Sequence, residues 1–551
     1  MRGGLGPIAV SRRRAATTIV ALAGLLAVFF SQFAWVRATN FGGTDEWLYI
    51  SLASRRALDI PYANRPFVLL WTLPAALVWP HDLRAYYVVH TAYLSLAGCL
   101  LFLLMRRLEP SRPLLAFLAA AISLTWAPLD FLRLDTVLLT GYSGFTFATL
   151  LTLVLFVESW VNDKPALLAL AGLLGLVTAR GFEGVLPLLM AAPLLLHRVG
   201  ATPSRRLRVW VLAWEALMLL IVALVIVPFF RPEGPGSYQA SALRLDPDPL
   251  RVTARLLRQY GYHLLPLVRS PLRELAVRAV PLAVLTFLGA FSLFALRQRG
   301  ATEDTEGRHA LALLAGLGLL LAGLGYAGFA LSPAILKAAR TQFLSAPGVG
   351  LFLAAAASLA ASALPLRWRT AALALMGAWV VAVGTGRTIA MQREWDESRS
   401  AYLPQRHSLL ELTRQVPDTK PNTLILLIDD ADAWPATFTF RHAVDYVYDG
   451  HALGYVWKAI DFLYPAYFVP LGLYYDPWPV IRKPWGVGPT LHRYDELVVA
   501  YAGRDGGLRV LRTWPVPILP PLPPGARYDP EARIVRGTRP PASRAILRLA
   551  R

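Results

Sequence analysis

Residues 15–36 read AATTIVALAGLLAVFFSQFAWV, a stretch of twenty-two residues without a charged side chain. A helix rises about 1.5 Å per residue, so this stretch is long enough to cross the roughly 30 Å hydrocarbon core of a bilayer. Three arginines at positions 12–14 precede it, and no small-residue cleavage pattern follows it. We therefore expect a retained signal anchor whose amino terminus lies in the cytoplasm.

The whole chain has the composition of an integral membrane protein. Hydrophobic residues make up 56% of its 551 residues and charged residues only 16%, and the mean hydropathy is +0.46. The net charge of +20 comes almost entirely from arginine, and arginines that flank apolar segments favour the cytoplasmic side and anionic lipid. Neither zinc-ligand spacing nor an RNA-binding motif accompanies them, so we expect membrane lipids rather than nucleic acid as partners.

Ten further apolar windows predict membrane spans, at 84–105, 113–129, 143–161, 165–178, 184–197, 209–230, 275–296, 310–331, 346–364 and 371–388. The windows at 165 and 184 are short, so we expect about 11–13 transmembrane helices in all. When the spans are threaded alternately through the bilayer, the short arginine clusters between them fall on the side of the amino terminus. The polar residues of functional interest then converge on the outer side.

The composition changes near residue 389. We predict a transmembrane domain over residues 1–388 and an extracytoplasmic soluble domain with a basic tail over residues 389–551. Within the second domain, residues 424–428 predict a buried strand, and residues 497–513 predict a hairpin around a glycine-containing turn. The predicted fold class is a polytopic α-helical membrane protein with a C-terminal mixed α/β domain.

Two segments between spans are expected at the membrane interface. Residues 67–79 are apolar but too short to span, and Pro74 interrupts them, which favours a half-buried or re-entrant helix. Farther on, Arg251, Arg255 and Arg258 recur at helical spacing beside apolar residues. This spacing predicts a helix with one cationic stripe that lies flat on the interface, and a solvated charged face is the alternative.

The first outer loop begins with an acidic pair, Asp45 and Glu46, directly after the first span. If residues 45–58 form a helix, Asp45, Tyr49 and Arg56 share one stripe of it. An acid on such a helix is expected to face a cavity, where it is available for chemistry. The alternative is that the pair caps the helix, because acids favour the first turn.

Several motifs follow one another in a characteristic order: Asp45-Glu46-Trp-Leu-Tyr49, Asn64-Arg65-Pro66-Phe-Val-Leu-Leu-Trp71, and a span closed by Arg106-Arg107. This order resembles the beginning of the GT-C glycosyltransferases of the protein O-mannosyltransferase and aminoarabinose-transferase type. Two later pieces are similar to motifs of the same families, namely Arg180-Gly181 and Arg340-Thr-Gln-Phe-Leu-Ser-Ala-Pro347. The resemblance covers about the first 200 residues and that later segment.

One position departs from the family pattern. These families often place an acid just before the fourth span, but this chain reads Leu139-Thr140-Gly141-Tyr142 there. Asp135, or failing that Asp130, is then the candidate for a second catalytic acid.

The resemblance implies an inverting glycosyltransferase. It would move one hexosyl or pentosyl group from a polyprenyl-phosphate donor to an envelope glycolipid, glycan or protein at the outer face of the cytoplasmic membrane. The transition state of that reaction contains a cationic sugar, a departing phosphate and an acceptor that loses a proton. The site therefore needs a carboxylate near the acceptor and fixed cations near the phosphate.

On this basis we assign Asp45 as the general base, Glu46 as a positioning group and Asp135 as a second acid. The candidates for binding the donor phosphate are Arg65, Arg180, Lys337 and Arg340. Tyr49, Arg56 and Glu183 are expected nearby, with Glu183 able to pair with Arg180. Arg65 and Arg180 have an alternative role as anchors at the level of the lipid head groups.

No cofactor is required by these motifs. The chain has no histidine–acid cluster typical of a tight metal site, although a loosely held divalent ion at Asp45 is compatible with the spacing. Two other functions remain open, a transporter or flippase of lipid-linked sugars and a non-catalytic envelope scaffold. The sugar, the acceptor and the oligomeric state are not encoded in any motif found here.

Overall fold

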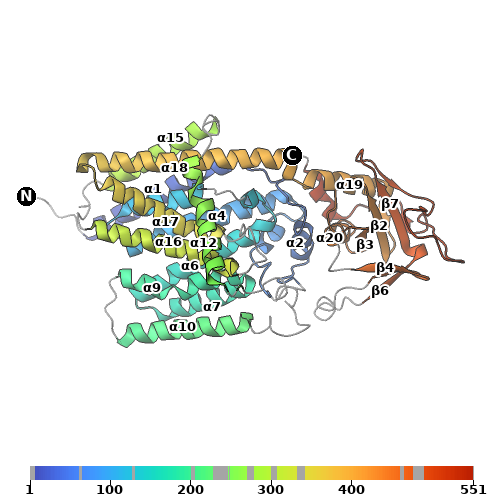
Figure 1. The fold of residues 1–551 in the computed structure, drawn as a ribbon, viewed down its shortest axis with the longest axis horizontal. Coiled ribbons are helices and arrows are strands. Elements are labelled where there is room, and N and C mark those ends of the chain that lie inside the picture. Colours follow the sequence, from blue (N-terminus) through green and yellow to red (C-terminus); the bar gives the residue numbers. More distant parts are fainter. Residues whose placement is uncertain are drawn as a thin grey trace, which may run out of the picture.

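The computed structural model describes residues 7–60, 65–126, 131–199, 205–226, 246, 248–269, 278–298, 307–331, 342–459, 465–475 and 489–549. Within these residues a bundle of long helices carries an α/β region at one end (Figure 1).

Eight helices of the described residues are long and apolar enough to cross a membrane. They are α1 (Pro7–Phe33), α4 (Leu83–Leu108), α6 (Leu138–Val161), α10 (Arg205–Ile226), α15 (Ala279–Gln298), α16 (Arg308–Ala330), α17 (Gln342–Ala361) and α18 (Leu366–Glu394). The chain is therefore a multi-pass membrane protein, as the hydropathy predicts.

The other three expected spans are shorter or divided. Two are the apolar helices α5 (Pro113–Thr125) and α7 (Pro165–Gly181). The third, expected over 184–197, is divided into η2 (Glu183–Val185), α8 (Leu186–Met190), α9 (Pro193–Leu196) and η3 (His197–Val199). Proline lies in the first turn of both α8 and α9, where its missing N–H and fixed φ are tolerated, so each proline starts a new short helix.

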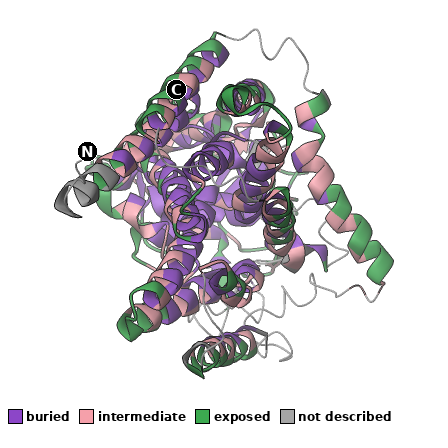
Figure 2. Ribbon diagram, turned by 90° about the vertical axis from the view of Figure 1, so that its left-hand side faces the viewer, coloured by how far each residue is buried: buried purple, intermediate pink, exposed green. Residues whose placement is uncertain are grey.

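The core of the bundle surrounds α5, whose residues are buried except for the half-buried Ser123. Seen end-on, buried residues occupy the centre of the bundle, and exposed residues lie on its outward-facing sides (Figure 2). Large apolar side chains such as Leu212 and Leu219 of α10 are among the exposed ones. This distribution suits a bundle whose rim faces lipid.

Both predicted interfacial segments contain helices. The segment 67–79 contains only the six-residue α3 (Leu73–Val78), and Pro74 lies in its first turn, so the proline begins this helix rather than breaking it. The cationic segment forms α12 (Pro249–Leu264), whose amino terminus is capped by the Asp248 carboxylate, which accepts from the backbone N–H of Leu250 at 2.9 Å. A short helix, α13 (Pro266–Arg269), follows.

The α/β region begins as α18 ends. A π-helical turn (Trp395–Arg399) leads into α19 (Tyr402–Gln415). A four-stranded sheet follows, with the order β3 (Ala452–Val456), β2 (Thr423–Asp429), β7 (Leu497–Ala502), β8 (Leu508–Val510). Strand β2 pairs in parallel with β3 and β7, and β7 forms an antiparallel hairpin with β8. The predicted buried strand and hairpin are both confirmed.

Smaller elements complete this region. A three-stranded antiparallel sheet contains β4 (Ala466–Val469), β5 (Gly472–Tyr475) and β6 (Thr490–Arg493), and β1 (Asp418–Thr419) pairs with β9 (Ile534–Val535). The tail forms η8 (Ala542–Arg548) and packs against α19, where the Tyr402 hydroxyl donates to the carbonyl of Ile546 at 2.6 Å.

The bundle and the α/β region meet through two helices. Helix α2 (Glu46–Ser54) belongs to the loop after α1, and α20 (Thr437–Val447) connects β2 to β3. Figure 1 shows α20 between α2 and the sheet. Asp445 of α20 forms an ion pair of 2.6 Å with Arg55 and accepts from the Ser51 hydroxyl at 3.1 Å. This contact places the acidic loop at the junction of the two regions.

Candidate active site

The loop that carries the acidic pair is held by the start of α19. The backbone N–H of Ala401 donates to the carbonyl of Phe41 at 2.9 Å. Gln405 accepts from the Trp47 indole at 2.8 Å and donates to the carbonyl of Gly43 at 3.3 Å. Gly43 has φ +84° and lies directly against Ala401, so its lack of a side chain permits both the turn and the close approach.

The two members of the acidic pair have different surroundings. Glu46 is fully buried, and its carboxylate accepts from the backbone N–H groups of Gly42 and Thr44, both at 2.7 Å. Asp45 is half-buried and lies at the position before α2, where its side chain makes no capping hydrogen bond. Glu46 therefore ties the backbone of residues 42–44 to the first turn of α2. The Asp45 side chain does not cap the helix.

Asp135 lies against the same loop. It is fully buried, and its Oδ2 accepts from the backbone N–H of Gly42 at 3.2 Å. Its Oδ1 accepts from the N–H groups of Val137 and Leu138 at 3.1 and 3.0 Å. A hydrogen bond also links the carboxyl groups of Asp135 and Glu46. The structure therefore brings together two of the acids that the sequence singled out separately, Glu46 as a positioning group and Asp135 as a second acid.

Burial determines the charge of this carboxyl pair. Loss of solvent, followed by the charge of Glu46, raises the pKa of Asp135 well above its ordinary value. Burial also raises the pKa of Glu46, although the hydrogen bond from Asp135 opposes the shift. Because two adjacent buried carboxyl groups cannot both ionise without a large cost, we expect the pair to share one proton.

Arg65 and Glu183 form a second buried pair beside α2. Arg65 Nε donates to Glu183 Oε2 at 2.8 Å, and its Nη2 donates to the other carboxylate oxygen. Burial alone would lower the pKa of Arg65, but the Glu183 carboxylate raises it above the ordinary value. The guanidinium likewise lowers the pKa of Glu183 despite burial. Tyr49 and Tyr142 lie within electrostatic reach of Arg65.

The other predicted site residues are more distant from this cluster or outside the description. Glu183 pairs with Arg65 and not with Arg180, whose guanidinium donates to the carbonyl of Leu224 in α10. Arg56 is exposed and adopts φ 60° just after α2, so this helix ends before residue 58. The candidates that lie outside the described residues are Asn64, Asp130, Lys337 and Arg340.

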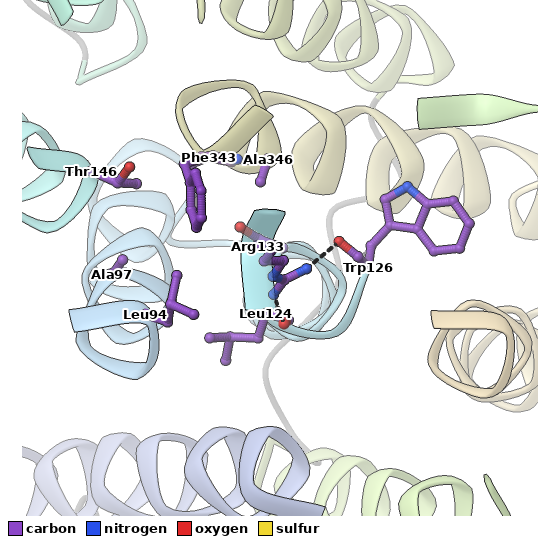
Figure 3. Close-up of a pocket in the computed structure, with 11 residues that line it drawn as sticks. Leu94, Ala97, Leu124, Trp126, Arg133, Thr146, Phe343 and Ala346 are labelled. Carbon is purple, nitrogen blue, oxygen red and sulfur yellow. Dashed lines mark hydrogen bonds between the residues drawn. The ribbon is translucent and has the colours of Figure 1, made fainter. Parts of the chain in front are cut away.

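A cavity of about 510 Å³ lies between α4, α5, α6 and α17. Figure 3 shows Leu94 and Ala97 of α4 facing Phe343 and Ala346 of α17 across it, with Arg133 at its wall. Sequence reasoning did not select Arg133, which is buried and donates to the carbonyls of Trp126 and Leu124. The only signal for it was a single cation between two apolar windows.

A second cavity of about 590 Å³ adjoins the first, since Thr146 and Pro347 line both. Its walls are almost wholly aliphatic and come from α4, α6, α8, α9, α16 and α17. Apolar walls of this extent suit a hydrocarbon chain and offer almost no polar group to hold a sugar.

The short helix η1 (Phe131–Leu134) connects the cavity to the acidic loop. Arg133 lines the cavity, and Asp135, two residues farther on, contacts Gly42 of the acidic loop. Asp135 and Arg133 of the cavity wall are therefore parts of one continuous segment of chain.

The described residues contain no group of three or more histidine, cysteine, aspartate or glutamate side chains that could hold a metal ion. No protein-family model matches this chain, and no curated protein matches it.

Proposed function

We propose that the protein is an inverting glycosyltransferase that moves one sugar from a polyprenyl-phosphate donor to an envelope acceptor. The observation that carries this proposal is the segment from Arg133 to Asp135, which joins an apolar cavity to the loop bearing Asp45. A lipid-linked sugar needs both features, because its chain requires an apolar wall while its reacting carbon requires polar groups at the same end.

Asp45 is the proposed general base. It is half-buried, so a substrate can reach it while the surrounding protein limits solvent. The acceptor hydroxyl loses its proton to Asp45, its oxygen bonds to the anomeric carbon, and the bond from that carbon to the lipid phosphate oxygen breaks with inversion. A base in this position contributes about 10²- to 10⁴-fold to the rate.

Glu46 and Asp135 are the proposed positioning groups. Both accept hydrogen bonds from the loop that precedes α2, and neither has an exposed surface that a substrate could touch. We infer that Asp135 acts through the loop and not as a second base, since it is fully buried and its carboxyl oxygens accept from three backbone N–H groups. The loop then holds Asp45 at a constant position relative to the cavity.

The donor phosphate needs a cation that is not already neutralised. Arg65 has a bidentate partner in Glu183, which disfavours it as the main phosphate ligand. Lys337 and Arg340 are the better candidates, because Arg340 precedes Phe343 of the cavity wall by only three residues. We place the end of the bundle that carries Asp45 on the outer side of the cytoplasmic membrane. The arginine clusters between the spans fall at the other end, and such clusters favour the cytoplasm.

The test is replacement of Asp45 by asparagine in a strain that lacks the native gene. Mass spectrometry of envelope glycolipids and glycoproteins should show a glycan shortened by one sugar in the deletion strain and in the Asp45→Asn strain. Wild type and Asp59→Asn should both restore it. Asp59 is the matched control, because it is a half-buried carboxylate of the same loop.

Full restoration of the glycan by Asp45→Asn, with equal protein in the membrane, would contradict a catalytic role for this acid. A transporter or flippase of lipid-linked sugars predicts that outcome if its gating does not use Asp45. A non-catalytic scaffold predicts that the deletion changes the abundance of the envelope glycans without shortening any of them by one sugar.

A further inference from the structure

Helix α12 presents three different faces, and one of them packs on the described part of the protein. On the packed face, Gln259 and His263 are buried. Arg255 donates to the carbonyl of Ala330 at 2.9 Å and pairs with Asp246. The Tyr260 hydroxyl donates to the carbonyl of Leu319 at 2.6 Å. These contacts hold α12 against the carboxyl-terminal half of α16.

The second face is apolar and exposed. Leu250 is 79% exposed and Leu257, seven residues later, is 63% exposed. The apolar exposure continues beyond the helix, where Val268 of α13 is 86% exposed. Leucines at these positions would be costly in water, because each leaves most of its apolar area unburied.

The third face is cationic. Arg251 and Arg258 are also seven residues apart and exposed, and the Arg251 side chain is 73% exposed although it pairs with Asp248 at 3.1 Å. At 100° per residue, residues seven apart lie within about 20° of one another, and each arginine lies about 100° from the leucine that precedes it. The arginines and leucines therefore form two parallel stripes along the same helix.

The position of α12 in the fold indicates what the two stripes contact. The helix runs across the long helices instead of along them (Figure 1). It lies at the end of α16, since the backbone N–H of Asp246 donates to the carbonyl of Leu331 at 2.9 Å. Exposed leucines lie beside these contacts, since Leu320 of α16 is 46% exposed and Leu331 is 43% exposed. The apolar stripe of α12 thus continues the apolar rim of the bundle at its edge.

We propose that α12 is a binding surface for anionic phospholipids of the bilayer. Leu250 and Leu257 contact the acyl chains, and Arg251 and Arg258 bind lipid phosphates at the level of the head groups. About 10 Å separates the two arginines along the helix, at 1.5 Å per residue, which suits two neighbouring head groups. An amphipathic helix with arginine beside its apolar stripe has the charge complementary to an anionic leaflet.

The experiment compares lipid retention by the full-length protein. Wild type and the variant Arg251→Gln/Arg258→Gln are purified, mixed with phosphatidylglycerol and phosphatidylcholine of equal chain length, and examined by native mass spectrometry. Wild type should retain phosphatidylglycerol preferentially. The double variant should bind it about 25-fold more weakly, at about fivefold for each lost charge near an anionic surface.

Two further variants make the result specific. Arg251→Lys/Arg258→Lys should keep the preference, because it keeps the charge. Arg512→Gln/Arg536→Gln should also keep it, since these arginines are exposed beside an acid but belong to the α/β region. An equal preference in wild type and Arg251→Gln/Arg258→Gln would overturn the proposal. So would loss of bound undecaprenyl phosphate without loss of phosphatidylglycerol, which would assign the surface to a donor lipid.

The depth of the helix provides a test that does not depend on the arginines. A spin label at Leu257→Cys, in a Cys99→Ser background in phosphatidylglycerol-containing vesicles, should be accessible to oxygen and protected from a water-soluble relaxing agent. A label at Arg258→Cys should show the opposite preference. Equal exposure of both labels to the water-soluble agent would show a solvated face, and the proposal would fail.

Discussion

Asp135 and Glu183 are two acids removed from most solvent at the same end of the bundle, yet their pKa values are shifted in opposite directions. Asp135 meets another carboxyl group and the backbone N–H groups of a loop, and burial raises its pKa. Glu183 meets the guanidinium of Arg65, which lowers its pKa in spite of burial. Burial raises the pKa of both acids, and the charge of the neighbouring group decides the direction of the net shift.

The two carboxyl-containing pairs, Arg65–Glu183 and Glu46–Asp135, therefore have different structural roles. The Arg65–Glu183 pair joins the segment before α3 to the end of α7, and it stays ionised because each charge is matched. The Glu46–Asp135 pair is expected to share a single proton and arranges the backbone that presents Asp45. One pair connects structural elements, and the other sets the position of a functional group.

The largest effect is expected from breaking the charge match. Glu183→Gln leaves Arg65 as a buried charge without a counter-charge, which costs about 3 kcal/mol. The melting temperature in detergent, followed by intrinsic fluorescence, should fall by several degrees. Glu411→Gln is the control, since it removes an exposed pair with Arg414 and should change stability by about 0.5 kcal/mol or less. Equal effects of the two variants would show that burial of the Arg65 pair contributes nothing.

The next effect concerns the room around the carboxyl pair. A Cβ added at Gly42 would lie 2.6 Å from Glu46 Oε1 and 3.1 Å from Asp135 Oδ2. Gly42→Ala should therefore displace the loop, destabilise the protein by about 1–3 kcal/mol and lower transfer activity. Gly316→Ala in α16 is the control, because a Cβ there meets nothing within 4 Å. Unchanged activity in Gly42→Ala would mean that the loop does not position Asp45.

A smaller effect distinguishes a protonated acid from an ionised one. Asp135→Asn replaces a neutral group by a neutral group of the same shape, so it should cost only about 1 kcal/mol. Asp135→Ala removes the acceptor of three backbone N–H groups as well as the partner of Glu46, and should cost about 1–3 kcal/mol more. Melting temperatures of the two variants test this order. An Asp135→Asn variant as unstable as Asp135→Ala would indicate that Asp135 is ionised.

The smallest effect is a change in the pH dependence of stability. The folded-state pKa of Asp135 lies above its ordinary value of 3.8, so above about pH 4 the folded protein retains a proton that the unfolded chain releases. The contribution of Asp135 to the free energy of unfolding therefore decreases as pH rises. Glu183 has the opposite sign, because its lowered pKa makes its contribution disappear as pH falls below 4.5.

Melting temperatures measured from pH 5 to pH 8 should thus decline less steeply in Asp135→Asn than in wild type. Glu183→Gln should keep the wild-type slope over that range, since Glu183 stays ionised throughout it. If the melting temperatures of wild type and Asp135→Asn decline equally with pH, Asp135 does not hold the shared proton.

Much of this architecture follows from local patterns. Long apolar windows identified the spans, the alternation of turn residues and aliphatic runs identified β2 and the β7–β8 hairpin, and arginine spacing identified α12. The Asp45–Glu46 motif lies in the loop that Asp135 contacts. In the segment 67–79 the only helix is α3, and Pro74 lies in its first turn. From the sequence alone, a proline at this position could either start or interrupt a helix.

Other properties depend on neighbours that lie far away along the chain. Arg65 and Glu183 are 118 positions apart, and Gly42 and Asp135 are 93 apart, so neither partnership is visible in a local pattern. Nor is the difference between the half-buried Asp45 and the fully buried Glu46, since both follow the same span.

The amino-acid sequence by itself therefore determines the membrane-spanning architecture, because hydropathy and helical periodicity act over a few turns of chain. Only the tertiary structure decides which acid is buried and in which direction its pKa shifts. The physical reason is that the free energy of a carboxylate depends on solvent, cations and N–H groups within a few ångströms, and folding alone brings these together.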